Sequence, residues 1–440
     1  MTGSRPQPPT VALRIETAVA VFIVAMSTAP LFPLLYAPKH LPYEDIVWMR
    51  YLWLPVYTAA ACYSVWHFRA LLRSAPAVIP TALLLVFAAA SAAWSIAPDI
   101  TVRRAEALGF NGLMAFYLAA RFSWRALVEI LACAILILAL GSYVMCLGLP
   151  HIGIHSEANA GAWRGLWPEK NELGFIMVIG AQASVACALL QPERRRLWVV
   201  SALLCATLVI LSRSGTSLLC MVGSIGAALG LVMARRGPTL AIGVAFLAGC
   251  ALLALVFTAV LDLPLVLSLL GKEPTLTGRT DVWAAVSHRI AERPMFGYGY
   301  AAFWYDMFGP ARLVREEAKW EVPSAHNGWL EMLLQIGWIG TVMAAAYCAL
   351  TVTTLLRRLF TRQDGFWALM YVGAFLALTF SESVIEKPNT IQWILFATIS
   401  IKLLADVLAP APARFRSSPA APKPELVSVR PSSAAPVSRR

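Results

Sequence analysis

The sequence predicts an all-α integral membrane protein, a polytopic helical bundle of about 12 transmembrane helices with a large external loop that carries short helices. Apolar residues make up 59% of the 440 residues, charged residues make up 14%, and the mean hydropathy is +0.68. Soluble domains are roughly half apolar and a quarter charged. The apolar segments are about 20 residues long, enough for a helix to cross ~30 Å of hydrocarbon, and none alternates like a barrel strand.

Twelve apolar segments are the expected spanning helices, and their flanking charges orient them. The first segment lacks a clear small-residue cleavage site, so we expect an anchor rather than a signal peptide. If the amino terminus is cytoplasmic, the arginine-rich loops fall on the inner side, as the positive-inside rule requires. Both termini are therefore expected in the cytoplasm. The segments lie near residues 14–36, 48–66, 76–94, 105–120, 126–148, 169–190, 197–212, 215–234, 238–262, 326–356, 366–384 and 390–408.

The expected bundle occupies residues 1–408, and two stretches within it are expected to be external loops. These loops cover residues 149–168 and 263–325. Residues 409–440 are rich in proline, alanine, serine and basic residues and cannot bury a core. We expect this tail to be disordered on the cytoplasmic side.

The sequence of the larger loop predicts one short helix. Thr280 or Asp281 can cap it, and Pro294 follows its end. Gly297 and Gly299 then allow a tight backbone. The apolar stripe of the helix is Val282, Val286 and Ile290, and the aromatic residues that follow are Phe296, Tyr298, Tyr300, Phe303, Trp304 and Tyr305. These aromatic residues fit a membrane-interface belt and a sugar- or lipid-binding surface equally well.

Several basic residues fall on the external side, against the charge rule. They are Arg103 and Arg104 after the third segment, Arg164 and Lys170 before the sixth, Arg213 between the seventh and eighth, and Arg279 in the larger loop. Such a residue can simply snorkel or pair with an acid, and this alternative stays open for Arg103 and Arg104. Arg213 is a stronger candidate, because its turn is very short and has no acidic neighbour. The net charge of +12 follows from the loops and the tail, so no nucleic-acid partner is expected.

Motifs for nucleotide or metal chemistry are missing. The sequence has no G-x-x-x-x-G-K-[ST] loop, no D-x-D pair, no H-E-x-x-H and no G-x-S-x-G elbow. The eight cysteines stand singly in apolar segments, where small hydrophobic side chains are expected. We therefore expect no cofactor and no metal site.

An ionisable side chain stands at the mouth of an apolar helix in "SAHNGWLEMLLQIGWIG", residues 324–340. The helix dipole opposes protonation of His326 and favours a neutral ring that can accept a proton. Arginine presents a planar fork that matches phosphate oxygens. A neutral histidine beside an arginine-bound diphosphate leaving group suits glycosyl transfer. The alternative, a histidine that only caps or anchors its helix, stays open. Asn327 is expected to orient the ring or the acceptor.

Five motifs in order resemble the signature region of the O-antigen ligase and polymerase superfamily, particularly its exopolysaccharide-polymerase branch. They are "WRGLWPEKNELG", "LSRSGTSLL", "TGRTDVW", "RPMFGYG" and "SAHNGWLEMLLQIGWIG", which span roughly residues 160–345. Further upstream, "WSIAPDITVRRA" resembles the superfamily's segment near Arg103. Members of this superfamily act outside the cytoplasmic membrane, without metal or nucleotide, on glycans carried by undecaprenyl diphosphate.

The resemblance implies an inverting, metal-independent glycosyltransferase of the bacterial inner membrane with its active face periplasmic. Its expected partners are an undecaprenyl-diphosphate-linked glycan donor, a glycan acceptor, membrane lipids and a chain-length regulator protein. His326, Arg279 and Arg213 are the expected catalytic residues. The expected substrate-binding residues are Arg164, Lys170, Asn171, Asn327, Arg103 and Arg104.

Three activities remain open at this point. Polymerisation of exopolysaccharide or capsule repeat units is the leading hypothesis, and ligation of a glycan to lipid A core or to protein uses the same donor chemistry. A flippase or transporter for polysaccharide lipids also needs many helices. It would be expected to bury charge deep in the bundle, and the sequence has little there.

Overall fold

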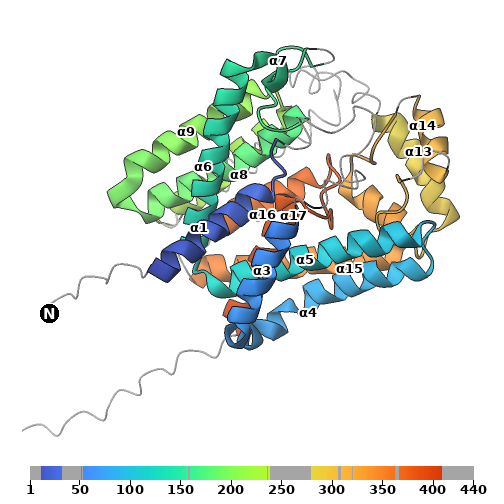
Figure 1. Ribbon diagram of the computed structural model, residues 1–440, viewed down its shortest axis with the longest axis horizontal. Coiled ribbons are helices and arrows are strands. Elements are labelled where there is room, and N and C mark those ends of the chain that lie inside the picture. The colour runs from blue at the N-terminus through green and yellow to red at the C-terminus, as the bar shows by residue number, and fades with distance from the viewer. Residues whose placement is uncertain are drawn as a thin grey trace, which may run out of the picture.

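The computed structural model describes residues 11–31, 51, 53–156, 159–234, 236–237, 279–305, 309–319, 321–361 and 366–408. Within them the regular elements are all helices and no β-strand is present, so the all-α prediction is confirmed there (Figure 1). The helices are α1 (Val11–Met26), α3 (Leu54–Trp66), α4 (Phe68–Ala90), α5 (Pro98–Arg121), α6 (Trp124–Gly148), α7 (Pro150–Gly153), α8 (Lys170–Leu190), α9 (Arg195–Leu211), α10 (Gly215–Ala234), α13 (Arg279–Glu292), α14 (Pro310–Ala318), α15 (Gly328–Thr361), α16 (Phe366–Leu378) and α17 (Ile391–Leu408).

The described residues support a multi-pass membrane protein but not about twelve spans. Six helices are long and apolar enough to cross a membrane, namely Ser74–Ala93, Trp124–Gly148, Lys170–Leu190, Gly215–Ala234, Gly328–Leu359 and Ile391–Leu408. Helices stand at five other expected positions, but α1, α3, α9 and α16 have only 13 to 17 residues, and α5 carries several charges. The expected segment 238–262, the tail 409–440 and the start of the larger loop lie outside the described residues.

Helix α8 lies at the centre of the bundle. Of its apolar window, 83% is buried inside the protein, against 28% for the corresponding window of α4. It packs against α6, α9, α10 and α16. Because α8 is enclosed by other helices, the polar residues at its amino end face protein as well as solvent.

Helix α15 is broken at Gly337, and the segment 294–299 completes the backbone hydrogen bonds there. Gly337 has φ 64° and ψ −168°. Tyr298 and Gly299 donate their backbone N–H groups to Leu334 and Gln335, at 2.9 and 2.8 Å, and Trp338 donates to the Pro294 carbonyl at 2.8 Å. A helix break in a membrane protein requires such compensation, because lipid offers no hydrogen bonds.

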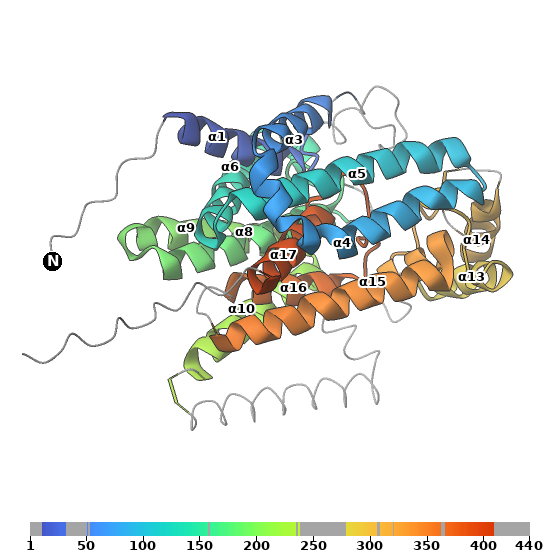
Figure 2. The ribbon, with the colours of Figure 1, turned by 90° about the horizontal axis from the view of Figure 1, so that it is seen from below.

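Helices α13 and α14 pack on each other at one end of the bundle, beyond the ends of α4, α5 and α15 (Figure 2). The short helix expected in the larger loop is confirmed as α13, with Val282 and Val286 buried. These two side chains share a separate small core with Tyr298, Phe303 and Val314. The tight backbone expected at the two glycines is also confirmed, with φ 65° at Gly297 and 101° at Gly299.

Candidate functional site

The carboxylate of Glu382 joins three of the candidate residues. Glu382 lies in the connection between α16 and α17. Arg279 donates from Nη2 to Glu382 Oε1 at 3.2 Å and from Nη1 to the Ser381 carbonyl at 2.9 Å. His326 Nδ1 lies 3.3 Å from Glu382 Oε2, and Asn171 Nδ2 donates to Oε1 at 3.3 Å. Side chains that are far apart in the sequence thus meet at one acid.

The cluster around Glu382 is sheltered but remains accessible. The side chains of Arg279, His326 and Glu382 are 17%, 23% and 22% exposed. Burial by itself would raise the pKa of the Glu382 carboxyl, but the hydrogen bond and charge of His326 and the charge of Arg279 outweigh it, and the pKa is lowered. Glu382 is therefore an anionic anchor for one guanidinium and one imidazole.

The loop that carries His326 is held by a second, buried acid, Glu331. Its Oε2 accepts hydrogen bonds from the Ala325 backbone N–H at 2.9 Å and from the Ser383 hydroxyl at 3.2 Å. Trp283, on α13, donates its indole N–H to the Ala325 carbonyl at 2.9 Å. The residues next to His326 and next to Glu382 are thereby attached to one carboxylate, which limits relative movement of the imidazole and its partner.

Asn327, rather than His326, caps the helix. Its Oδ1 accepts from the backbone N–H groups of Trp329 and Leu330, at 3.0 and 3.2 Å, and α15 begins at Gly328. His326 precedes this cap in a left-handed conformation, with φ 47°. The expectation that His326 opens the helix is therefore wrong by two residues. The same contacts give Asn327 a capping role through its Oδ1 atom, and its expected contact with the ring or the acceptor stays a prediction.

The amino end of α8 brings further charges to this region. Glu169 directly precedes the helix and interacts electrostatically with Arg164, Lys170, His326 and Glu382. Arg164 is itself anchored, because its Nε donates to the Ile152 carbonyl at 2.7 Å. One acid, Glu169, and two basic residues, Arg164 in the loop before α8 and Lys170 at the start of the helix, therefore lie beside the Glu382 cluster.

Arg213 lies in the turn between α9 and α10, with φ 51°. Its exposed guanidinium donates to the Ala160 carbonyl at 3.2 Å and packs over Gly161, where a Cβ would come within 3.4 Å of both terminal nitrogens. It also interacts electrostatically with Lys170. No direct contact between Arg213 and Glu382 is present in the part of the chain that the structure describes. Arg213 therefore adjoins the cluster through Lys170.

The amino ends of α8 and α10 lie in contact. A Cβ at Gly174, in the second turn of α8, would approach the hydroxyls of Ser217 and Ser212 to 2.6 and 2.9 Å. Ser217 belongs to the first turn of α10. Helix α15 also begins beside the Glu382 cluster, since Gly328 donates its N–H to the Thr379 carbonyl at 2.7 Å. Several positive helix-dipole ends thus reinforce the basic side chains in this region.

Arg103 and Arg104 lie in the second turn of α5. Thr101, just before them, donates its hydroxyl to the Tyr300 carbonyl at 2.9 Å. Arg104 shares a helix face with Asn111, seven residues later, whose side chain bonds to Asn389. The described contacts thus connect this face of α5 with the segment that follows Glu382, without placing either arginine at the Glu382 carboxylate.

Glu382 was missed as a site residue by reasoning from the sequence. The available signal was an acid in the short polar stretch "SESVIEKPN", between two apolar segments. Acids near helix ends usually face water, so the position alone did not distinguish it. Only the fold shows that this connection meets α8, α13 and the His326 loop.

The fold and the cluster define a polytopic helical membrane protein with an anchored histidine and arginine, bordered by further basic residues and helix amino ends. These groups can bind an anionic ligand and accept a proton beside it.

Residues 200–345 match the model of the O-antigen ligase family. That range includes Arg213, Arg279, His326 and Asn327. The chain is also 27% identical over 319 residues to the exopolysaccharide production protein ExoQ of Rhizobium meliloti (strain 1021), an alignment that covers 67% of this chain and 70% of the relative. The two matches confirm the resemblance to the O-antigen ligase and polymerase superfamily and its exopolysaccharide branch, whose members act on lipid-linked glycans.

Proposed function

We propose that the protein is an inverting glycosyltransferase that polymerises exopolysaccharide or capsule repeat units carried on undecaprenyl diphosphate. The observation that carries this proposal is the attachment of His326 and Arg279 to one carboxylate, Glu382. A base and a diphosphate-binding cation are needed at the two ends of the same transfer step. The similarity to an exopolysaccharide production protein supports a glycan substrate.

In this proposal the donor diphosphate binds to the basic residues around the cluster. Arg279 has five N–H donors, more than its two contacts with Ser381 and Glu382 use. Lys170 and Arg213 add positive charge, and the amino ends of α8 and α10 add their dipoles. Each group stabilises the negative charge that grows on the leaving diphosphate.

His326 acts as the general base. When its Nδ1–H is donated to Glu382, the Nε2 atom carries the lone pair that accepts a proton. The acceptor hydroxyl gives its proton to Nε2 while its oxygen forms a bond to the anomeric carbon of the donor sugar. The bond from that carbon to the diphosphate oxygen breaks, and its electron pair leaves with undecaprenyl diphosphate. Attack from the side opposite the leaving group inverts the anomeric configuration.

We place this site on the periplasmic face of the inner membrane, with both chain ends in the cytoplasm. The basis is the distribution of arginine between the loops, because arginine-rich loops lie on the cytoplasmic side according to the positive-inside rule. The expected partners are the lipid-linked donor, a glycan acceptor, membrane lipids and a chain-length regulator. No metal or nucleotide has a place in the proposed step.

Replacement of His326 tests the proposal. His326→Ala should lower turnover per folded molecule by about 10²- to 10⁴-fold, because general base catalysis contributes about that much, while binding of the donor lipid persists. His288→Ala is the matched control, since that exposed imidazole pairs with Glu317. Near-normal turnover of the His326 variant would make this histidine structural.

The second candidate is a ligase that transfers a finished glycan to lipid A core or protein, in keeping with the description of the matching family. Purified protein given only lipid-linked repeat units separates the two activities. A ladder of lengthened lipid-linked products identifies a polymerase. Transfer that requires added lipid A core or protein identifies a ligase. Unchanged glycan redistributed between leaflets would contradict both and identify a flippase.

A further inference from the structure

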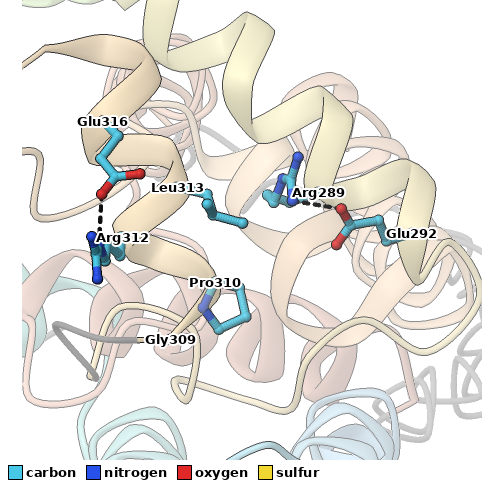
Figure 3. A pocket seen from close by; sticks show the side chains of 7 residues that line it. All are labelled: Arg289, Glu292, Gly309, Pro310, Arg312, Leu313 and Glu316. Carbon is cyan, nitrogen blue, oxygen red and sulfur yellow. Dashed lines mark hydrogen bonds and ion pairs between the residues drawn. The ribbon is translucent and has the colours of Figure 1, made fainter.

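A pocket lies between α13 and α14, away from the Glu382 cluster (Figure 3). Its volume is about 380 Å³. Two arginine–glutamate pairs face it, Arg289 with Glu292 from α13 and Arg312 with Glu316 from α14. Apolar surface lies between the pairs. The lining residues are Arg289, Glu292, Gly309, Pro310, Arg312, Leu313 and Glu316.

The polar groups on the α13 side of the pocket are already held in place by contacts within the protein. Tyr298 donates its hydroxyl to Glu292 Oε2 at 2.5 Å, and a terminal nitrogen of Arg289 pairs with Glu317 at 3.6 Å. The Arg289 side chain is 16% exposed, and its Nε is buried without a hydrogen-bond partner in the described residues. A ligand that meets such fixed groups loses less entropy on binding than one that must order mobile side chains.

The charge of the pocket distinguishes it from the proposed diphosphate site. Its two arginines and two glutamates sum to zero, whereas the region around Lys170, Arg213 and Arg279 has an excess of cations. Paired donors and acceptors beside an apolar patch suit the hydroxyl groups and C–H faces of a sugar. They do not suit a free phosphate, because each arginine of the pocket is neutralised by a glutamate and no net positive charge remains for an anion.

Helix α13 connects the Glu382 cluster rigidly to the pocket between α13 and α14. Arg279 begins the helix and contacts Glu382, whereas Arg289, ten residues later, lines the pocket. At 1.5 Å per residue the two positions lie about 15 Å apart along the helix axis. Trp283, between them, contacts the residue before His326. An extended ligand of several sugars has the length to occupy both places.

We propose that the α13–α14 pocket binds sugars of the donor glycan that are distant from the diphosphate. This inference rests on the proposed function, which supplies a lipid-linked oligosaccharide at Arg279. The pocket then selects donors that carry a complete repeat unit, because a single sugar on the diphosphate does not reach it.

The test is binding of a lipid-free oligosaccharide to the solubilised full chain. The probe is a repeat-unit fragment made by partial hydrolysis of the polysaccharide that the host cell produces. Leu313→Trp fills the pocket, and the double variant Arg312→Ala/Glu316→Ala removes an exposed pair, of a kind that contributes about 0–1 kcal/mol to stability. Each should weaken binding about tenfold, the loss expected from one or two hydrogen bonds. Glu321→Ala, an exposed position outside the pocket, is the control.

A transfer assay on the same variants separates the two proposals. For both pocket variants, the ratio of kcat/KM for the complete donor to kcat/KM for a single-sugar donor should fall about tenfold. His326→Ala should lose transfer but bind the oligosaccharide like the unchanged protein. Equal binding by all variants, or no saturable binding by the unchanged protein, would overturn the pocket proposal even if transfer occurs. Pocket-dependent binding without any transfer would instead uphold the pocket and overturn the proposed glycosyltransferase.

Discussion

The replacement Glu382→Gln isolates the charge that joins the candidate catalytic residues. The substitution keeps the size of the side chain and one acceptor oxygen but removes the negative charge. Glu382 makes two charge-assisted contacts, with Arg279 at 3.2 Å and with His326 at 3.3 Å. Such hydrogen bonds contribute about 1.5–3 kcal/mol each, and glutamine can replace only one of them, so the expected loss is about 1.5–3 kcal/mol. If the whole loss raises the activation free energy, turnover falls about 10- to 150-fold.

The assay is turnover of lipid-linked glycan per folded molecule, with the thermal unfolding midpoint measured in parallel. Glu382→Asp is the comparison, because it keeps the charge on a shorter side chain. It should retain more activity than Glu382→Gln. A glutamine variant within threefold of the unchanged protein, at equal folded amount, would refute the view that this carboxylate positions His326 and Arg279.

Three further predictions follow from the charges of the described residues. Arg279→Lys should reduce transfer almost as far as Arg279→Ala does, because Arg279 makes a forked contact. Arg213→Lys should be milder, because Arg213 is exposed and contacts one carbonyl. Donor-lipid binding and turnover are measured for both, and full activity of both lysine variants would exclude the two arginines from the site. The carboxyl oxygens of Glu386 have no hydrogen-bond partner in the described residues, and burial raises the pKa of this group from 4.5 to about 8. The free energy of unfolding is therefore highest below pH 4.5 and falls as the pH rises to about 8. Glu386→Gln should abolish this decline, on the order of 5 kcal/mol, in thermal unfolding between about pH 4 and 9, and parallel curves would contradict it. An alkaline phosphatase fusion near Ala318 should be active and one near Arg236 inactive, and the reverse would contradict the proposed sidedness.

Much of the fold and several residues of the candidate site could be predicted from the sequence. Long apolar segments require helices in lipid, because only a helix satisfies its own backbone there, and α13 was predictable from its apolar stripe and following proline, although it begins at Arg279, before the expected cap at Thr280 or Asp281. The bases Arg213, Arg279 and His326 stood out as ionisable groups in an apolar chain. The number of spans was harder to predict, because α1, α3 and α16 are shorter than the apolar segments expected at their positions.

The sequence by itself determined the helical membrane class and the residue types available for chemistry, because hydropathy and charge are local properties of the chain. Only the tertiary structure decided that Glu382 is the common partner of Arg279, His326 and Asn171, which come from three separate segments. It also decided that Asn327 caps α15 and that Glu331 fixes the loop beside His326. These contacts depend on how helices pack around α8, and no local pattern encodes the distance between side chains that are tens to hundreds of residues apart.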